Sequence, residues 1–133
     1  REVAARHLGD RVEFLGFQSD EQIEAMWQQA WVFAMPSRGE GFGLVYAEAM
    51  RHGVPVIASV HDAAPEVNVD GVTGYNIDLD HLDELPERLL HLLANPDACR
   101  ALGVAGYQRW QTHFTYSAFR QRFRLLLNEF LAT

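Results

Sequence analysis

The chain has 133 residues, with 11 Lys or Arg against 18 Asp or Glu, which gives a formal net charge of −7, and 48% of the residues are hydrophobic. This length suits one domain core and argues against a second domain. The acidic balance disfavours nucleic acid as a partner, because sequence-independent affinity for nucleic acid comes from Lys and Arg side chains that neutralise phosphates.

The single cysteine, Cys99, excludes an internal disulfide framework and a cysteine-built zinc site, and it fits a reducing compartment. No apolar stretch approaches the roughly 20 residues of a membrane span, and the chain does not begin like a signal peptide. We therefore expect a cytoplasmic protein. Helical spacing of Ala4, His7 and Leu8, without an initiator Met or a preceding cap, predicts an N-terminally truncated domain that fills residues 1–133.

The first half of the chain predicts two strands and one helix. Residues 12–15 are rich in β-forming side chains and predict a short strand. Ser19 and Gln22 have the spacing of a capping box, which predicts a helix over residues 20–30. The continuous apolar run 31–35 predicts a strand covered on both faces, as in a parallel sheet.

A glycine-rich loop at 37–43 follows, and the composition after it predicts a helix from residue 44 that closes at Gly53. The remaining pattern predicts a buried strand at 54–58, a strand at 75–77 after a turn at 70–74, and helices over 82–93 and 96–109. A last helix has one apolar face, made of Phe119, Phe123, Leu126, Leu127 and Phe130. The three tryptophans, Trp27, Trp31 and Trp110, are expected in the core.

Strands that alternate with helices at this spacing predict an α/β fold, a Rossmann-like parallel sheet flanked by helices. In such sheets ligands bind beyond the carboxyl ends of the strands. The 37–43 loop follows a predicted strand directly, so the ligand site is expected there. No GxGxxG motif follows a strand, which disfavours a dinucleotide-dependent oxidoreductase.

The start of the helix after this loop has the features of a diphosphate site. Gly41 and Gly43 allow close approach of the backbone, and the first helical amides, those of Leu44 and Val45, point outward without intrahelical partners. Glu48 lies about one turn further on, between small and apolar residues. That position predicts a buried carboxylate, which the vicinal hydroxyls of a ribose would satisfy.

Glu40, on the loop itself, lies near where the far end of a diphosphate ligand would project. A carboxylate there accepts hydrogen bonds from sugar hydroxyls or stabilises a developing positive charge. From spacing alone, an alternative remains open, in which Glu40 is a solvated loop residue and Glu48 pairs with an arginine.

The runs 35–50, 52–59, 65–67 and 70–74 together resemble the C-terminal domain of retaining glycosyltransferases of the two-Rossmann, or GT-B, type (glycosyltransferase family 4, glycosyl transferases group 1). The likeness extends from about residue 12 to at least residue 74, and more loosely to the end. It implies that the chain is the C-terminal half of a GT-B architecture, truncated at its N-terminus.

The resemblance also implies roles for the site. Glu40 would contact the donor sugar of a nucleotide-sugar as the catalytic residue, and Glu48 would hold the ribose hydroxyls. The remaining donor contacts would come from Gly41, Phe42, Gly43, Leu44 and Val45. Transfer in this family retains configuration, with no metal, no cofactor and a front-face mechanism in which the leaving phosphate assists the acceptor.

The chain departs from the family pattern in two places. His61-Asp62-Ala63-Ala64 stands where a glycine pair usually precedes Pro-Glu, and Arg51-His52 stands where small residues are commoner. The basic pair for the donor phosphates and the acceptor-binding N-terminal domain would both lie upstream of residue 1.

We therefore expect the donor-binding part of a retaining glycosyltransferase that acts on a saccharide, lipid or small-molecule acceptor, and is inactive alone. The alternative is a non-catalytic Rossmann-like binding or interaction domain derived from a transferase.

The other polar features have ordinary explanations. The six histidines match no metal-ligand spacing, so no metal site is expected, and His52 and His61 are expected as loop or helix-end residues. Arginines beside the apolar face of the last helix would suit peripheral contact with an anionic membrane, although packing against this domain or the missing N-terminal domain is the commoner reason for such a face. These arginines are Arg120, Arg122 and Arg124.

Overall fold

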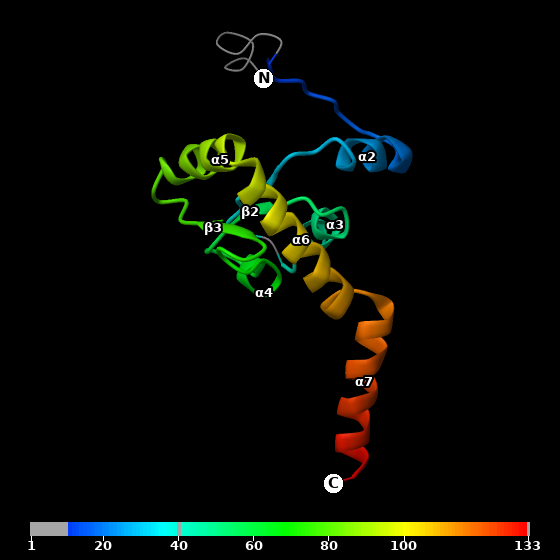
Figure 1. The fold of residues 1–133 in the computed structure, drawn as a ribbon. Coiled ribbons are helices and arrows are strands. Elements are labelled where there is room, and N and C mark those ends of the chain that lie inside the picture. Colours follow the sequence, from blue (N-terminus) through cyan, green and yellow to red (C-terminus); the bar gives the residue numbers. More distant parts are fainter. Residues whose placement is uncertain (1–10, 40, 133) are drawn as a thin grey trace.

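The computed structural model describes residues 11–39 and 41–132, so the predicted helical segment near residues 4–8 and the loop residue Glu40 lie outside the described residues. Three parallel strands form one sheet in the order β1, β2, β3 (Figure 1). They are β1 (Phe33–Ala34), β2 (Val56–Ser59) and β3 (Gly74–Ile77). The α/β fold with a parallel sheet is thereby confirmed.

Helices cover both faces of this sheet because β2 is apolar on both sides. Val56 and Ala58 pack with α3 (Leu44–Arg51) and α4 (Ala64–Val67). Ile57, which points to the opposite face, packs with residues of α5 (Glu84–Ala94) and α6 (Pro96–His113). All four residues of β2 are buried, which confirms the predicted buried strand and makes β2 the centre of the domain.

The long helix α6 joins the two faces at the amino-end edge of the sheet. Its first half packs through Cys99 and Leu102 with the α5 face, while Gly106 lies against Met50 of α3. Between them, Gly103 contacts the backbone of Gly53 so closely that any side chain would collide with that carbonyl. A glycine is therefore required where α6 crosses the turn between α3 and β2.

The N-terminal elements agree only partly with the sequence. Helix α2 (Asp20–Trp27) has the predicted capping box, in which Ser19 and Gln22 exchange side-chain and backbone hydrogen bonds, but it ends before Ala30. The strand predicted at 12–15 is wrong, since these residues are exposed and pair with no strand in the described part of the chain. β propensity alone does not form a strand without a hydrogen-bonded neighbour.

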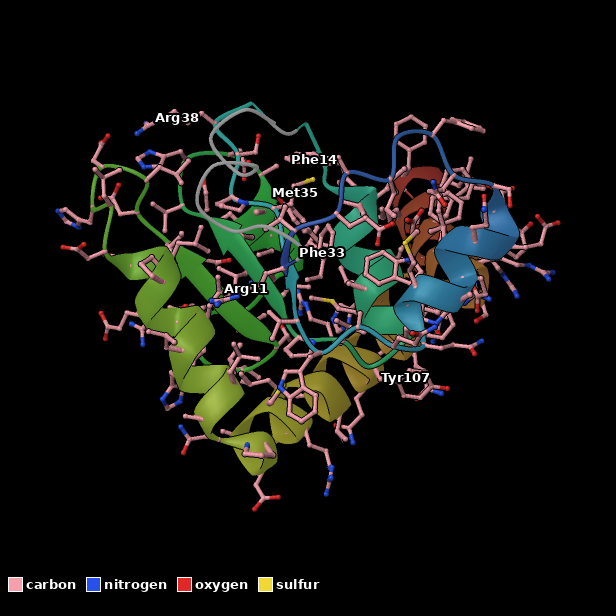
Figure 2. The ribbon with its side chains drawn as sticks, turned by 90° about the horizontal axis from the view of Figure 1, so that it is seen from above. Arg11, Phe14, Phe33, Met35, Arg38 and Tyr107 are labelled. Carbon is pink, nitrogen blue, oxygen red and sulfur yellow. The ribbon has the colours of Figure 1, made fainter. Side chains whose placement is uncertain are left out.

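Strand β1 is shorter and more exposed than predicted. Only Phe33 and Ala34 are in the ladder, and Ala34 is exposed, so the expectation of cover on both faces is wrong within the described residues. Phe33 and Met35 point into the interior against the α3 side (Figure 2). Trp31 is 50% exposed, which corrects the prediction that all three tryptophans are in the core, whereas Trp27 and Trp110 do pack against it.

The last helix, α7 (Tyr116–Leu131), projects away from the rest of the domain (Figure 1). The side chain of Thr115 caps its start, and its apolar face is as the sequence predicts, but no residue of the helix is buried among the residues described. The side chains of the predicted apolar face are between 43% and 76% exposed, and they are those of Phe119, Phe123, Leu126, Leu127 and Phe130. Of the helices described, not one combines the length and the hydrophobicity that crossing a membrane requires.

Candidate functional site

The carboxyl ends of all three strands meet at one edge of the sheet, and short hydrogen bonds join the loops that leave them. Ser59, at the end of β2, is fully buried and donates its hydroxyl hydrogen bond to the carbonyl of Ser37 in the loop after β1. The same hydroxyl oxygen accepts the backbone N–H of His61, at 2.9 Å. The β1 loop, which carries the predicted site, is therefore anchored to the centre of the sheet.

Gly43 fixes where α3 begins. Its φ of +75° lies in the left-handed region, and a side chain on it would collide with the ring of Tyr46. The hydroxyl of Tyr46 in turn donates to the carbonyl of Met35, at 2.9 Å, just after β1. Because both features demand glycine at position 43, the start of α3 is held against the carboxyl end of β1 as the sequence predicts.

The start of α3 presents groups suited to an anion. Gly43 has no side chain to cap the helix, so the amides of Leu44 and Val45 have no acceptor within α3. Leu44 is 68% exposed, and Phe42 is also exposed. A side chain at Gly41 would meet nothing within 4 Å in the described structure, so the loop leaves room beside the helix start.

Glu48 lies one turn into α3 and is exposed, so the prediction that its carboxylate is buried is wrong. The buried side of α3 consists of Tyr46, Ala47, Ala49 and Met50, which leaves Leu44 and Glu48 on the opposite stripe. Glu48 borders a groove of about 240 Å³ between α2 and α3. The other residues that line this groove are Asp20, Ile23, Glu24, Trp27, Arg51 and His52.

His52, which also lines this groove, contacts α2. Its ring stacks on Trp27, with ring centroids 6.0 Å apart, and its Nε2 lies 3.4 Å from a carboxylate oxygen of Glu24. His52 is also the C-terminal cap of α3, which confirms its prediction as a helix-end residue. These contacts join the end of α3 to α2.

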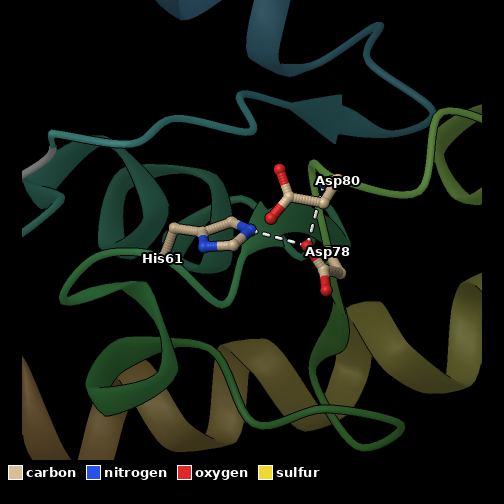
Figure 3. Close-up of side chains that lie close together, drawn as sticks. All are labelled: His61, Asp78 and Asp80. Carbon is tan, nitrogen blue, oxygen red and sulfur yellow. Dashed lines mark hydrogen bonds and ion pairs between the residues drawn. The ribbon is translucent and has the colours of Figure 1, made fainter.

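A second polar cluster lies at the same edge of the sheet, on the loops after β2 and β3. The Nε2 atom of His61 is 2.7 Å from Oδ1 of Asp78, and Asp80 lies beside them (Figure 3). Asp80 forms an ion pair with Arg38, which belongs to the loop after β1. All three strand-end loops are therefore joined by polar side chains.

Hydrogen bonds in this cluster change the acidity of its groups. The backbone N–H of Asp80, followed by the side chain of His61, lowers the pKa of Asp78. A hydrogen bond with Glu84 raises the pKa of His81, and the backbone N–H of Asp78 lowers the pKa of Glu84. The charged forms of these groups are thus favoured together.

Sequence reasoning placed the α3 start correctly but missed this second cluster. His61 and Asp78 are 17 residues apart and belong to no recognisable spacing. The available signal was topological, since both residues follow predicted parallel strands and the carboxyl ends of neighbouring strands share an edge.

The parallel sheet flanked by helices defines the fold class as Rossmann-like, and similar solved structures are GT-B glycosyltransferases. The family model described as glycosyl transferases group 1 matches residues 1–109, and the chain belongs to that family. The resemblance inferred from the sequence is thereby confirmed.

Two relatives illustrate the family. The chain is 33% identical over 130 residues to a GDP-mannose-dependent monoacylated alpha-(1-6)-phosphatidylinositol monomannoside mannosyltransferase from Corynebacterium glutamicum, which covers 92% of this chain and 34% of the relative. It is 35% identical over 130 residues to a D-inositol 3-phosphate glycosyltransferase from Mycobacterium leprae, covering 92% of this chain and 30% of the relative. The chain thus spans about a third of the length of these relatives.

Solved structures agree with this relationship. Sucrose-phosphate synthase from Thermosynechococcus elongatus superposes with a TM-score of 0.84 at 32% identity, over 98% of this chain and 33% of the other. HepE from Anabaena, solved in complex with UDP, superposes with a TM-score of 0.85 at 25% identity, over 96% of this chain and 35% of the other. Both matches cover nearly the whole of the present chain.

Proposed function

We propose that this chain is the donor-binding part of a retaining glycosyltransferase that moves a sugar from a nucleotide-sugar to a saccharide, lipid or small-molecule acceptor. One observation carries the proposal. Helix α3 begins at a glycine against the carboxyl end of β1, with two amides directed away from the helix and an exposed carboxylate one turn later. This arrangement suits a diphosphate followed by a ribose.

The diphosphate would be held by the amides of Leu44 and Val45. These are the first amides of an eight-residue helix, and the positive end of the helix dipole adds to their attraction for an anion. Gly41, Phe42 and Gly43 would line the approach, where the backbone carries no bulky side chain at either glycine. Such fixed donors also stabilise the charge that builds on the leaving diphosphate during transfer.

The ribose would lie over the exposed stripe of α3. Helical side chains lean toward the N-terminus of their helix, so the carboxylate of Glu48 reaches back toward a group bound by Leu44 and Val45. A carboxylate accepts hydrogen bonds from two vicinal hydroxyls. The nucleoside would extend from there toward the groove between α2 and α3, which Glu48 borders.

We assign Glu40 to the donor sugar from the family resemblance, as the catalytic residue. It follows Gly39 and precedes Gly41 in the loop anchored by Ser59, so it belongs to the segment that leads from β1 to the diphosphate site. The reaction would retain configuration and use no metal, with the leaving phosphate assisting the acceptor hydroxyl.

The relatives support this reading and suggest its acceptor class. HepE was solved with UDP and with UDP-glucose, and the mycobacterial and corynebacterial relatives are named for GDP-mannose and for phosphatidylinositol mannosides. These relatives are about three times as long as this chain. We propose that the acceptor binds to a further domain, and that residues 1–133 alone do not transfer the sugar.

Nucleotide binding tests the proposal. The protein at its natural length is screened by thermal unfolding against UDP, GDP, ADP and their common sugar conjugates, because a ligand that binds the native state raises the unfolding temperature. We expect one nucleotide to raise it, and Glu48→Gln to reduce that shift. Glu40→Gln should abolish the difference between the nucleotide and its sugar conjugate.

The matched control is Glu87→Gln, which removes another exposed carboxylate, from helix α5. It should leave the nucleotide shift unchanged. If no nucleotide stabilises the protein, the donor-site proposal is wrong. If a nucleotide binds but no sugar is transferred to any acceptor by the full-length protein, the chain is instead a binding domain derived from a transferase.

A further inference from the structure

The cluster on the loops after β2 and β3 brings together ligand types that bind transition metals. His61 Nε2, a carboxylate oxygen of Asp78 and a carboxylate oxygen of Asp80 all lie within 4.8 Å of one another (Figure 3). His61 and Asp78 are half-buried, while Asp80 lies at the surface. The loops that carry them leave adjacent parallel strands, so the sheet holds their backbones at a fixed separation.

Neighbouring groups hold the His61 ring beside Asp78. The Nε2 atom of His61 lies 2.7 Å from Oδ1 of Asp78, which itself accepts the N–H of Asp80. The backbone nitrogen of Leu79 lies 3.2 Å from the same Nε2 atom. The ring nitrogen and the Asp78 carboxylate are thus held face to face by the loops that carry them.

The surrounding charge favours a dication. Asp78, Asp80 and Glu84 supply three carboxylates, against one guanidinium, that of Arg38. His81 is the remaining basic group, with its Nδ1 3.1 Å from Glu84 and 3.9 Å from Asp78. The carboxylates outnumber the guanidinium by two, an excess of negative charge that one divalent cation would balance.

We propose that His61, Asp78 and Asp80 form a binding site for a divalent first-row transition metal of the Zn²⁺ type. An imidazole nitrogen with two carboxylates suits Zn²⁺, Co²⁺ or Ni²⁺ better than Mg²⁺ or Ca²⁺, which prefer oxygen ligands alone. The inference departs from the sequence-based expectation of no metal site, because the fold joins residues that sequence spacing separates. It is independent of the proposed sugar transfer, in which the metal takes no part.

Arg38 would compete with the metal for the Asp80 carboxylate. In the structure its guanidinium forms an ion pair with the Asp80 carboxylate, and both side chains are more than half exposed. A metal bound to Asp80 would displace Arg38. Removal of the guanidinium should therefore tighten metal binding, whereas a purely structural role of the ion pair predicts no change or a loss.

Calorimetric titration of the protein at its natural length, free of any affinity tag, with ZnCl₂ tests the site. We expect one Zn²⁺ to bind per chain, and Co²⁺ to give visible absorption bands that Zn²⁺ removes. His61→Ala and Asp80→Asn should each weaken Zn²⁺ binding by at least about tenfold, as expected for loss of a ligand. Arg38→Gln should strengthen it.

His91→Ala is the matched control, since it removes an exposed histidine of α5 outside the cluster. Asp80 is 69% exposed, so Asp80→Asn keeps the test valid even if His61→Ala fails to fold. Failure of wild-type protein to bind Zn²⁺ would overturn the proposal and leave only a hydrogen bond between His61 and Asp78. Binding that is weakened equally by His91→Ala, or not weakened by Asp80→Asn, would also overturn it.

Discussion

Helices α3 and α7 both have an amphipathic sequence, but the rest of the domain covers the apolar side of α3 and leaves that of α7 exposed. Tyr46, Ala49 and Met50 of α3 are completely buried against the sheet, whereas α7 has no buried residue in the described structure. Spacing of apolar residues thus predicts a helix and its apolar face, but not what covers that face. The stability of this chain should therefore depend strongly on α3 and hardly on α7.

The largest effect is expected from Met50→Ala. The side chain is completely buried between the sheet and Gly106 of α6, so its removal leaves a cavity where α3 and α6 meet. Loss of a buried methionine typically costs about 2–5 kcal/mol of the free energy of unfolding. Urea unfolding monitored by circular dichroism measures it, and a loss below about 1 kcal/mol would contradict the packing described.

A somewhat smaller effect is expected from Asn68→Ala, which disrupts buried polar contacts under the sheet. The Asn68 amide donates to the carbonyl of Tyr75 at 3.1 Å and to Oδ1 of Asn76 at 2.8 Å, and its own Oδ1 accepts from Thr73. Leaving these buried partners unsatisfied costs about 1–3 kcal/mol. Asn128→Ala, at an exposed position on α7, is the control and should change unfolding by less than about 0.5 kcal/mol.

Helix α2 is an intermediate case, because it depends on its capping box rather than on burial. No residue of α2 is buried, and Ser19 accepts the N–H of Gln22 while Gln22 accepts the N–H of Ser19. Ser19→Ala should cost about 1 kcal/mol. Hydrogen exchange should show the loss confined to α2, and equal loosening of α3 would contradict this local account.

The same cap predicts a weak pH dependence through Glu21. The Ser19 hydroxyl donates to the Glu21 carboxylate and, with the backbone N–H of Glu21, lowers the pKa of that group below its ordinary value of 4.5. Stabilisation is therefore present above about pH 4.5 and is lost as the pH falls through the lower folded value. Unfolding of wild type and Glu21→Gln should differ slightly at pH 6 and converge near pH 3. A difference that grows on acidification would refute it.

The smallest effect is expected from Leu126→Ala on α7. The side chain is already 64% exposed, so its removal loses little buried apolar surface. The change in the free energy of unfolding should be below about 0.5 kcal/mol. A loss above about 1 kcal/mol would mean that α7 is covered in solution. Sedimentation at two protein concentrations would then show whether a second copy covers it.

The parts of this fold that local chemistry determines were predictable. The Ser19 cap, the glycine start of α3 and the apolar strand β2 all follow from near neighbours in the sequence. Features that depend on distant partners were not. Residues 12–15 lack a neighbouring strand in the described chain, and Trp31 lies at an uncovered edge, although both look like core in the sequence.

In the candidate site, too, local features were predictable and features that depend on distant residues were not. The loop, the helix start and Glu48 lie in one continuous segment, so a pattern of glycines and carboxylates predicts them. The exposure of Glu48 depends on which side of α3 faces the sheet, and the meeting of His61 with Asp78 depends on strand order. Both require the tertiary structure.

The central claim is that the start of α3 binds the diphosphate of a nucleotide-sugar, and amide NMR of ¹⁵N-labelled protein tests it most directly. Addition of the stabilising nucleoside diphosphate should shift the amide resonances of Leu44 and Val45 more than any others. The amides of Asp97 and Ala98, at the start of α6 by the opposite edge of the sheet, should not move. Shifts at α6 with none at Leu44 and Val45 would contradict the account.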